Sequence, residues 1–87
     1  MCIIGLSVRA QKFLDNFDRN IRERIENRLR NLKGNPVPSD VKFIRREKGL
    51  MLFRYRIGDY RVLYKFMKKD KIILVTKIDK RPRVYSK

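Results

Sequence analysis

The fold of this chain is decided by residues 53–64, which read Phe53-Arg54-Tyr55-Arg56-Ile57-Gly58-Asp59-Tyr60-Arg61-Val62-Leu63-Tyr64. Two runs of alternating side chains flank Gly58-Asp59, a pair typical of the two-residue loop of a β-hairpin. If these two residues form the loop, the expected register is Ile57 opposite Tyr60, Arg56 opposite Arg61, Tyr55 opposite Val62 and Phe53 opposite Tyr64.

The two faces of this hairpin differ in chemistry, because successive side chains of a strand point to opposite faces. We expect one face to be buried; it holds Phe53, Tyr55, Ile57, Tyr60, Val62 and Tyr64. The other face holds Arg54, Arg56 and Arg61, with Lys65 further along. Like charges directly across a strand pair cost stability. Two interpretations follow: a phosphate-binding face, or a solvated face on which the arginines extend into water.

The composition is that of one small globular domain, residues 1–87, with 43% apolar side chains. The sequence has no apolar run long enough for a membrane span and no pattern of a secretory signal. A lone cysteine, Cys2, suits a reducing compartment, so we expect a cytoplasmic protein. With one cysteine and no histidine, a zinc site of the usual ligands is excluded, and we expect no cofactor.

The charge of the chain is strongly positive and unevenly distributed. The net charge is +15, from 24 Lys and Arg against 9 Asp and Glu. Residues 1–41 carry 8 basic and 5 acidic side chains, whereas residues 42–87 carry 16 basic and 4 acidic ones. The charge is therefore concentrated in the half that contains the hairpin. This balance favours a polyanionic partner, such as nucleic acid, an acidic protein or an anionic membrane surface.

The order of the remaining elements predicts an α+β fold. Residues 2–6 are expected to form a short strand, and Ser7 and Asp18 are placed to cap two helices. The apolar stripes of these helices are Ala10, Phe13, Leu14 and Phe17 in the first, and Ile21, Ile25, Leu29 and Leu32 in the second. Further strands are expected at 41–45, 50–57, 60–67 and 71–78, with a charged bend at 46–49.

These elements predict an N-terminal strand and a helical hairpin packed on one face of a mainly antiparallel, twisted sheet of four or five strands. The apolar face of the 53–64 hairpin must then meet the helices. Its arginine face must point outward, which leaves an open basic surface.

The motif at 53–64 resembles the signature of the RelE/ParE toxins of bacterial and archaeal toxin–antitoxin pairs, nearly position for position. The ending Lys80-Arg81-Pro82-Arg83-Val84-Tyr85 resembles the terminal basic segment of the same family. Members of the RelE branch cleave messenger RNA in the ribosomal A site. The resemblance therefore implies a ribosome-dependent endoribonuclease that inhibits translation, with the ribosome and mRNA as partners and no membrane partner.

The resemblance also implies roles for individual residues. Arg61 would contact the scissile phosphate, Arg81 would stabilise the phosphate or the leaving group, and Tyr85 would stack on a base or assist proton transfer. Arg54 and Arg56 occupy positions where well-studied members carry lysines, one of them implicated in proton transfer. The basic side chains expected to bind the RNA backbone are Lys48, Lys65, Lys80 and Arg83.

The general base is the open question of this mechanism. Histidine usually moves protons near neutral pH, and the chain has none. Arginine stays protonated and is a poor base. Neighbouring cations favour the neutral form of a lysine. A lysine packed among arginines could therefore act as the base, which makes Lys65 and Lys80 candidates. Glu47 and Tyr85 are the other candidates. Arg54 and Arg56 could instead bind phosphate only, without proton transfer.

Two other functions remain open from the sequence. One is a ParE-like toxin that inhibits DNA gyrase without nuclease chemistry, and the other is a non-enzymatic nucleic-acid-binding module. In either toxin interpretation the expected partner is a cognate RelB-like antitoxin, whose flexible acidic segment would wrap the basic face and fold as it binds.

Overall fold

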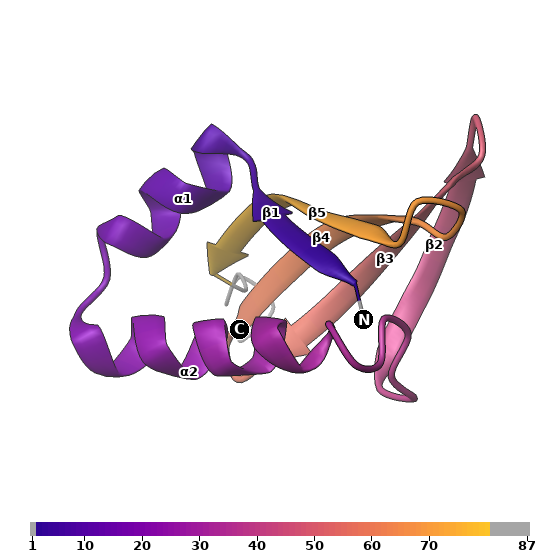
Figure 1. The fold of residues 1–87 in the computed structure, drawn as a ribbon. Coiled ribbons are helices and arrows are strands. Elements are labelled where there is room, and N and C mark those ends of the chain that lie inside the picture. Colours follow the sequence, from indigo (N-terminus) through magenta and orange to yellow (C-terminus); the bar gives the residue numbers. More distant parts are fainter. Residues whose placement is uncertain (1, 81–87) are drawn as a thin grey trace, which may run out of the picture.

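The computed structural model describes residues 2–80 and confirms the α+β architecture. Its elements are β1 (Ile3–Leu6), α1 (Val8–Asp15), α2 (Arg19–Asn31), β2 (Val41–Glu47), β3 (Leu50–Ile57), β4 (Tyr60–Met67) and β5 (Ile72–Lys80). The sheet has five strands in the order β1-β5-β4-β3-β2 (Figure 1). Strand β1 runs parallel to β5, and the other neighbours are antiparallel. None of the described helices is long and apolar enough to span a membrane.

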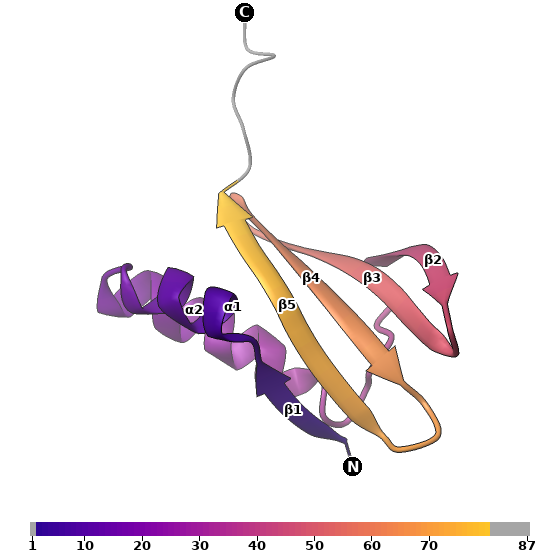
Figure 2. The same cartoon turned by 90° about the horizontal axis from the view of Figure 1, so that it is seen from above.

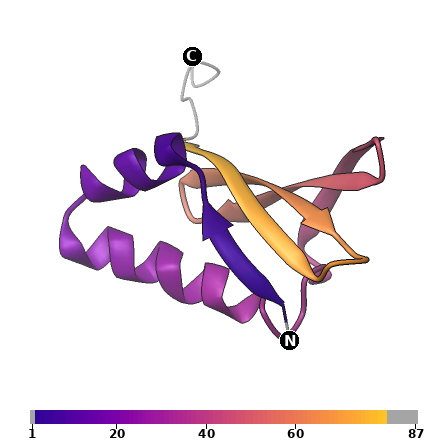
Figure 3. The ribbon, with the colours of Figure 1, turned by 45° about the horizontal axis from the view of Figure 1, so that its top comes forward.

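The two helices lie on one side of the sheet, as the sequence predicted, and leave the other side open (Figure 2). Helix α1 packs on β5 and β1, whereas β2 and its turn extend away from both helices (Figure 3). The buried side of the helices is provided by Ala10 and Leu14 from α1, and by Ile25 and Leu29 from α2. In residues 2–80 the buried core therefore lies on the helix side of the sheet.

Both helices begin directly after the predicted cap residues, Ser7 and Asp18. The Ser7 hydroxyl accepts a hydrogen bond from the Ala10 amide at 3.1 Å, and the Asp18 carboxylate accepts one from the Ile21 amide at the same distance. Helix α1 ends at Asp15, so Phe17 lies in the turn between the helices rather than on α1. There its ring packs edge-on against Tyr60, with ring centroids 5.0 Å apart.

The central hairpin has the predicted register. Ile57 pairs with Tyr60 and Arg56 with Arg61, and the loop is Gly58-Asp59. Gly58 has φ of +59°, a conformation that glycine adopts without a steric cost. All six side chains expected on the inner face, Phe53, Tyr55, Ile57, Tyr60, Val62 and Tyr64, are buried.

The expected bend at 46–49 is a second tight turn rather than a longer charged loop. Strand β2 continues to Glu47, and the turn consists of Lys48 and Gly49. Both residues have positive φ, +45° and +82°, which suits a two-residue hairpin loop and lets the flanking strands pair up to the turn.

Tyr64 connects the hairpin to the segment of the chain that joins α2 to β2. Its side chain is 1% exposed and its ring stacks on Phe53, with centroids 5.4 Å apart. Its hydroxyl donates a hydrogen bond to the Pro36 carbonyl at 2.6 Å. Burial raises the pKa of Tyr64 well above its ordinary 10.0, and the neighbouring Tyr55 and Asp40 raise it further.

This raised pKa predicts a loss of stability at alkaline pH. The neutral hydroxyl contributes its full stabilisation below the unfolded pKa of 10.0, and this is lost as pH rises toward the higher folded pKa. Above about pH 10 the free energy of unfolding should fall by up to about 1.4 kcal/mol per pH unit from this group. Urea unfolding of wild type and Tyr64→Phe from about pH 9 to about pH 11 tests this, because other titrations cancel in the difference. Parallel pH profiles would contradict it.

Candidate nucleic-acid interface

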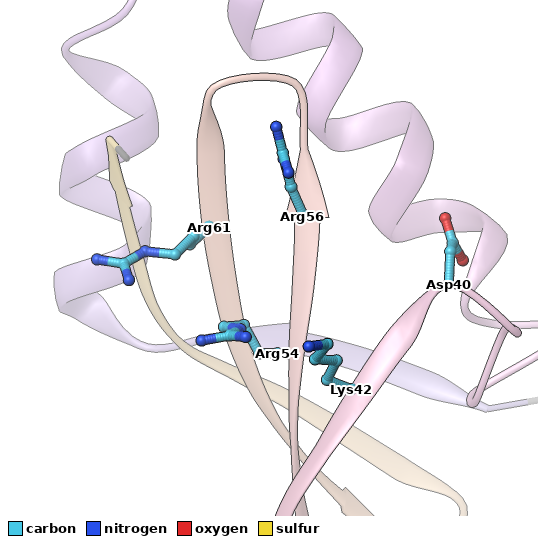
Figure 4. Close-up of a pocket in the computed structure, with 5 residues that line it drawn as sticks. All are labelled: Asp40, Lys42, Arg54, Arg56 and Arg61. Atoms are coloured by element: carbon cyan, nitrogen blue, oxygen red, sulfur yellow. The ribbon is translucent and has the colours of Figure 1, made fainter. Parts of the chain in front are cut away.

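The open side of the sheet gathers four cationic side chains in one place. Arg54 and Arg56 extend from β3, Arg61 from β4, and Lys42 of β2 pairs with Arg54 in the register. Together with Asp40 they line a hollow of about 390 Å³ (Figure 4). We call the surface formed by Lys42, Arg54, Arg56 and Arg61 the arginine face. It forms because strand alternation sends these residues away from the buried rings opposite.

The facing pair Arg56 and Arg61 separates its charges by turning in different directions. Arg56 points toward the hairpin loop, where its Nε donates to the Gly58 carbonyl at 3.4 Å (Figure 4). Arg61 turns away from it toward β5, and its Nε lies 3.5 Å from Oδ1 of Asp79. The compensating carboxylate thus comes from β5 and not from the hairpin itself.

Asp79 also holds a second cation and borders a second hollow. Nζ of Lys77 lies 3.4 Å from Oδ2 of Asp79. The second hollow has a volume of about 240 Å³ and is lined by Ile44, Arg54, Arg61, Leu63, Lys77 and Asp79. Arg54 and Arg61 line both hollows, so they lie between them.

A β-bulge explains why Lys77 and Asp79 reach this face. The β4–β5 register shifts at Leu63/Tyr64: Leu63 pairs with Lys77 but Tyr64 with Val75, which leaves Thr76 as an extra residue. The Thr76 hydroxyl donates to the Leu63 carbonyl at 3.2 Å, and its own carbonyl accepts from the Ser7 hydroxyl at 2.9 Å. The shift puts Asp79 directly opposite Arg61.

Helix α2 supports the rim of the first hollow. Nη1 of Arg28 donates to the Tyr55 hydroxyl at 3.1 Å and lies 3.8 Å from Oδ2 of Asp40. Asp40 is therefore held at the point where the chain enters β2. It supplies the carboxylate in the lining of this hollow.

Three residues predicted to bind RNA, Lys48, Lys65 and Lys80, lie away from the arginine face. Lys65 is four residues from Arg61 along β4, about 13 Å at the usual strand rise. Its strand neighbours are the apolar Leu52 and Leu74. Together with Glu47, Lys48 and Leu50 it lines a separate hollow of about 450 Å³. Lys65 is therefore not packed among arginines, which was the reason for considering it as a base.

Lys80 is also placed differently from the expectation. It pairs with Tyr60, whose ring is buried on the helix side, and residues directly opposite each other share a face. Its register position is thus on the side opposite to Arg61. The remaining predicted residues, Arg81, Arg83 and Tyr85, lie outside the described residues.

Sequence reasoning missed Lys42, Lys77 and Asp79. The alternation of Lys77 and Asp79 around Ile78 was a signal, but the last strand was expected to end at Ile78 and it continues to Lys80. Lys42 could have been found from its place between Val41 and Phe43 on the preceding strand.

The architecture is that of a small basic α+β domain, with two helices on one side of a five-stranded sheet and cationic side chains on the other. A family model described as the ParE toxin of the type II toxin–antitoxin system parDE matches residues 4–85. The chain therefore belongs to the RelE/ParE family of toxins.

Individual relatives agree with this assignment. A Methanocaldococcus jannaschii protein named "Putative toxin RelE1" is 33% identical over 83 residues, which cover 94% of this chain and 92% of the relative. The RelE–RelB complex from Pyrococcus horikoshii contains a chain of TM-score 0.86 and 30% identity, with 94% of this chain and 97% of that chain covered. The isolated Escherichia coli RelE toxin shares the fold, with TM-score 0.76, 22% identity, and coverage of 99% and 93%.

Proposed function

We propose that this toxin is a ribosome-dependent endoribonuclease that cleaves mRNA in the A site and so inhibits translation. The observation that carries the proposal is the hollow lined by Lys42, Arg54, Arg56 and Arg61 on the open side of the sheet. RNA cleavage by its own 2′-hydroxyl builds negative charge on the phosphoryl oxygens. Guanidinium groups already in place at that position stabilise this charge without reorganisation.

In this mechanism Arg61 binds the scissile phosphate, and Arg54 and Arg56 provide further charge from the neighbouring strand. Lys65, Lys80 and Glu47 are unsuitable as the base, because none of them lines the hollow. Asp40 lines it and joins Tyr85 as a candidate for accepting the 2′-hydroxyl proton. Arg81 and Tyr85 retain the roles that the family resemblance implies. Arg81 stabilises the phosphate or the leaving group, and Tyr85 stacks on a nucleobase or assists proton transfer.

The proposed partners are the ribosome, mRNA and an antitoxin. The solved Pyrococcus horikoshii relative is a RelE–RelB complex. We propose that this chain likewise binds a cognate antitoxin, and that an acidic segment of it covers the arginine face. Opposite charges would speed this association and compete with RNA for the same cations.

The test is a translating extract to which the purified protein is added. We expect new mRNA ends at A-site codons, and no cleavage of the same mRNA without ribosomes. The ParE description of the family model favours one alternative, inhibition of gyrase. A gyrase inhibitor would stabilise cleaved plasmid DNA and leave mRNA intact. A passive binder would do neither, yet its log affinity for single strands would fall with log salt by about 0.7 per phosphate contact.

A further inference from the structure

We infer that Asp79 is a positioning residue for Arg61: it directs the guanidinium toward β5 and at the same time weakens the hold of the free arginine face on RNA phosphates. The inference rests on the proposed function for its consequence in cleavage. Its binding consequence depends only on the geometry of four side chains, Arg54, Arg61, Lys77 and Asp79.

The first argument is the position of Asp79 in the sheet. It pairs with Arg61 across β4 and β5, so both side chains leave the sheet on the same side. Its two oxygens lie 3.5 Å from Nε of Arg61 and 3.4 Å from Nζ of Lys77. The three side chains are 37%, 40% and 31% exposed for Arg61, Lys77 and Asp79, so solvent only partly screens the contacts.

The second argument is the repulsion that Asp79 offsets. Arg56 and Arg61 are directly opposed, an arrangement that costs stability when nothing compensates for it. Asp79 attracts the Arg61 guanidinium to the side away from Arg56. A guanidinium has five N–H donors, and the contact with Asp79 is made at Nε. The two terminal nitrogens are thereby left for a phosphate.

The third argument concerns the bound RNA. A phosphate held by Arg54 and Arg61 would lie close to Asp79, because all three side chains line the second hollow. Two unit charges about 4 Å apart in a water-like medium change an equilibrium by about fivefold. Asp79 therefore opposes binding of the substrate phosphate while it fixes the group that stabilises the transition state. Removing the Asp79 carboxylate should then raise the affinity for the substrate and lower the catalytic rate.

The test is Asp79→Asn, with a short oligouridylate as the binding probe and a ribosome-dependent cleavage assay as the second readout. We expect the Kd for the oligonucleotide to fall by about threefold to tenfold, in keeping with the charge removed. The salt slope should stay close to that of wild type, because the terminal nitrogens of Arg61 already reach the phosphate and the number of phosphate contacts does not change. In the cleavage assay KM and kcat should both fall. Asp79→Glu, which keeps the carboxylate, should restore wild-type behaviour in part.

Asp70→Asn is the matched control, because it makes the same change in net charge at an exposed turn between β4 and β5. If Asp79→Asn and Asp70→Asn give the same Kd and kcat, the inference is wrong. A wild type that neither binds RNA nor cleaves mRNA would contradict the proposed function instead. In an Arg61→Ala background the effect of Asp79→Asn on Kd should shrink, and this cycle isolates the pair even if the single variant is less stable.

Discussion

Replacing Arg61 by alanine should lower ribosome-dependent cleavage by about 10²–10³-fold, the usual consequence of removing one group that stabilises a transition-state charge. Arg61 lines both hollows of the arginine face and has its Nε directed to Asp79, so its terminal nitrogens are the ones available to a phosphate. The measurement is the rate at which new mRNA ends form in a translating extract. Circular dichroism and thermal unfolding should change little, because the side chain lies on the open side of the sheet.

Two further variants separate the role of Arg61 from a general loss of charge. Arg9→Ala removes the same charge from an exposed position on α1, on the helix side, and should cleave like wild type. Arg61→Lys keeps the charge but loses the planar fork that binds phosphate through two donors, so it should recover only part of the rate. Equal rates for Arg61→Ala and Arg9→Ala would show that Arg61 contributes only to the overall charge.

The local features of this fold could be predicted because short-range patterns specify them. Alternation on both sides of Gly58-Asp59 gave the hairpin, its register and the composition of each face. Ser7 and Asp18 gave the starts of the two helices. Each of these features depends on residues close in sequence, where turn chemistry and side-chain periodicity are sufficient. The outward position of Arg54, Arg56 and Arg61 followed directly from them.

The charge partners of the arginines could not be predicted in the same way, because they depend on pairing between β4 and β5. The inward residues of β5 include Val75 and Ile78, which are three positions apart and break the alternation of a regular strand. The bulge at Thr76 accommodates this spacing. A shift of one residue moves every later side chain to the other face. Without the bulge, Asp79 would lie on the helix side, away from Arg61.

Two different features of the sheet explain the placement of Lys65 and Lys80. Lys65 shares a face with Arg61, as expected, but distance along the strand separates the two side chains. Lys80 follows Asp79 directly, so the register that brings the carboxylate to Arg61 places the lysine opposite Tyr60. The carboxylate that lines the first hollow, Asp40, lies in the turn just before β2 and belongs to no motif in the sequence.

Tyr64→Ala should destabilise the domain by about 3–5 kcal/mol, the range found when a large buried ring is removed from a core. Folded domains of this size have a total of about 5–15 kcal/mol, so much of the stability would be lost. The ring of Tyr64 stacks on Phe53, and its hydroxyl holds Pro36. Urea unfolding at neutral pH measures the change, and Tyr64→Phe, which removes only the hydroxyl, should cost about 1–2 kcal/mol.

Phe43→Ala provides the matched control for the loss of an aromatic ring. Phe43 faces the same side of the sheet and packs against Phe53, with centroids 5.7 Å apart, but it lies on the edge strand and is 55% exposed. Its removal should cost about 1 kcal/mol or less. An equal loss of stability in Tyr64→Ala and Phe43→Ala would contradict the view that the rings buried on the helix side hold the arginine face in place. With the expected difference, the inner pair of Phe53 and Tyr64 fixes β3 against β4, and thereby holds Arg54, Arg56 and Arg61 together on the opposite side.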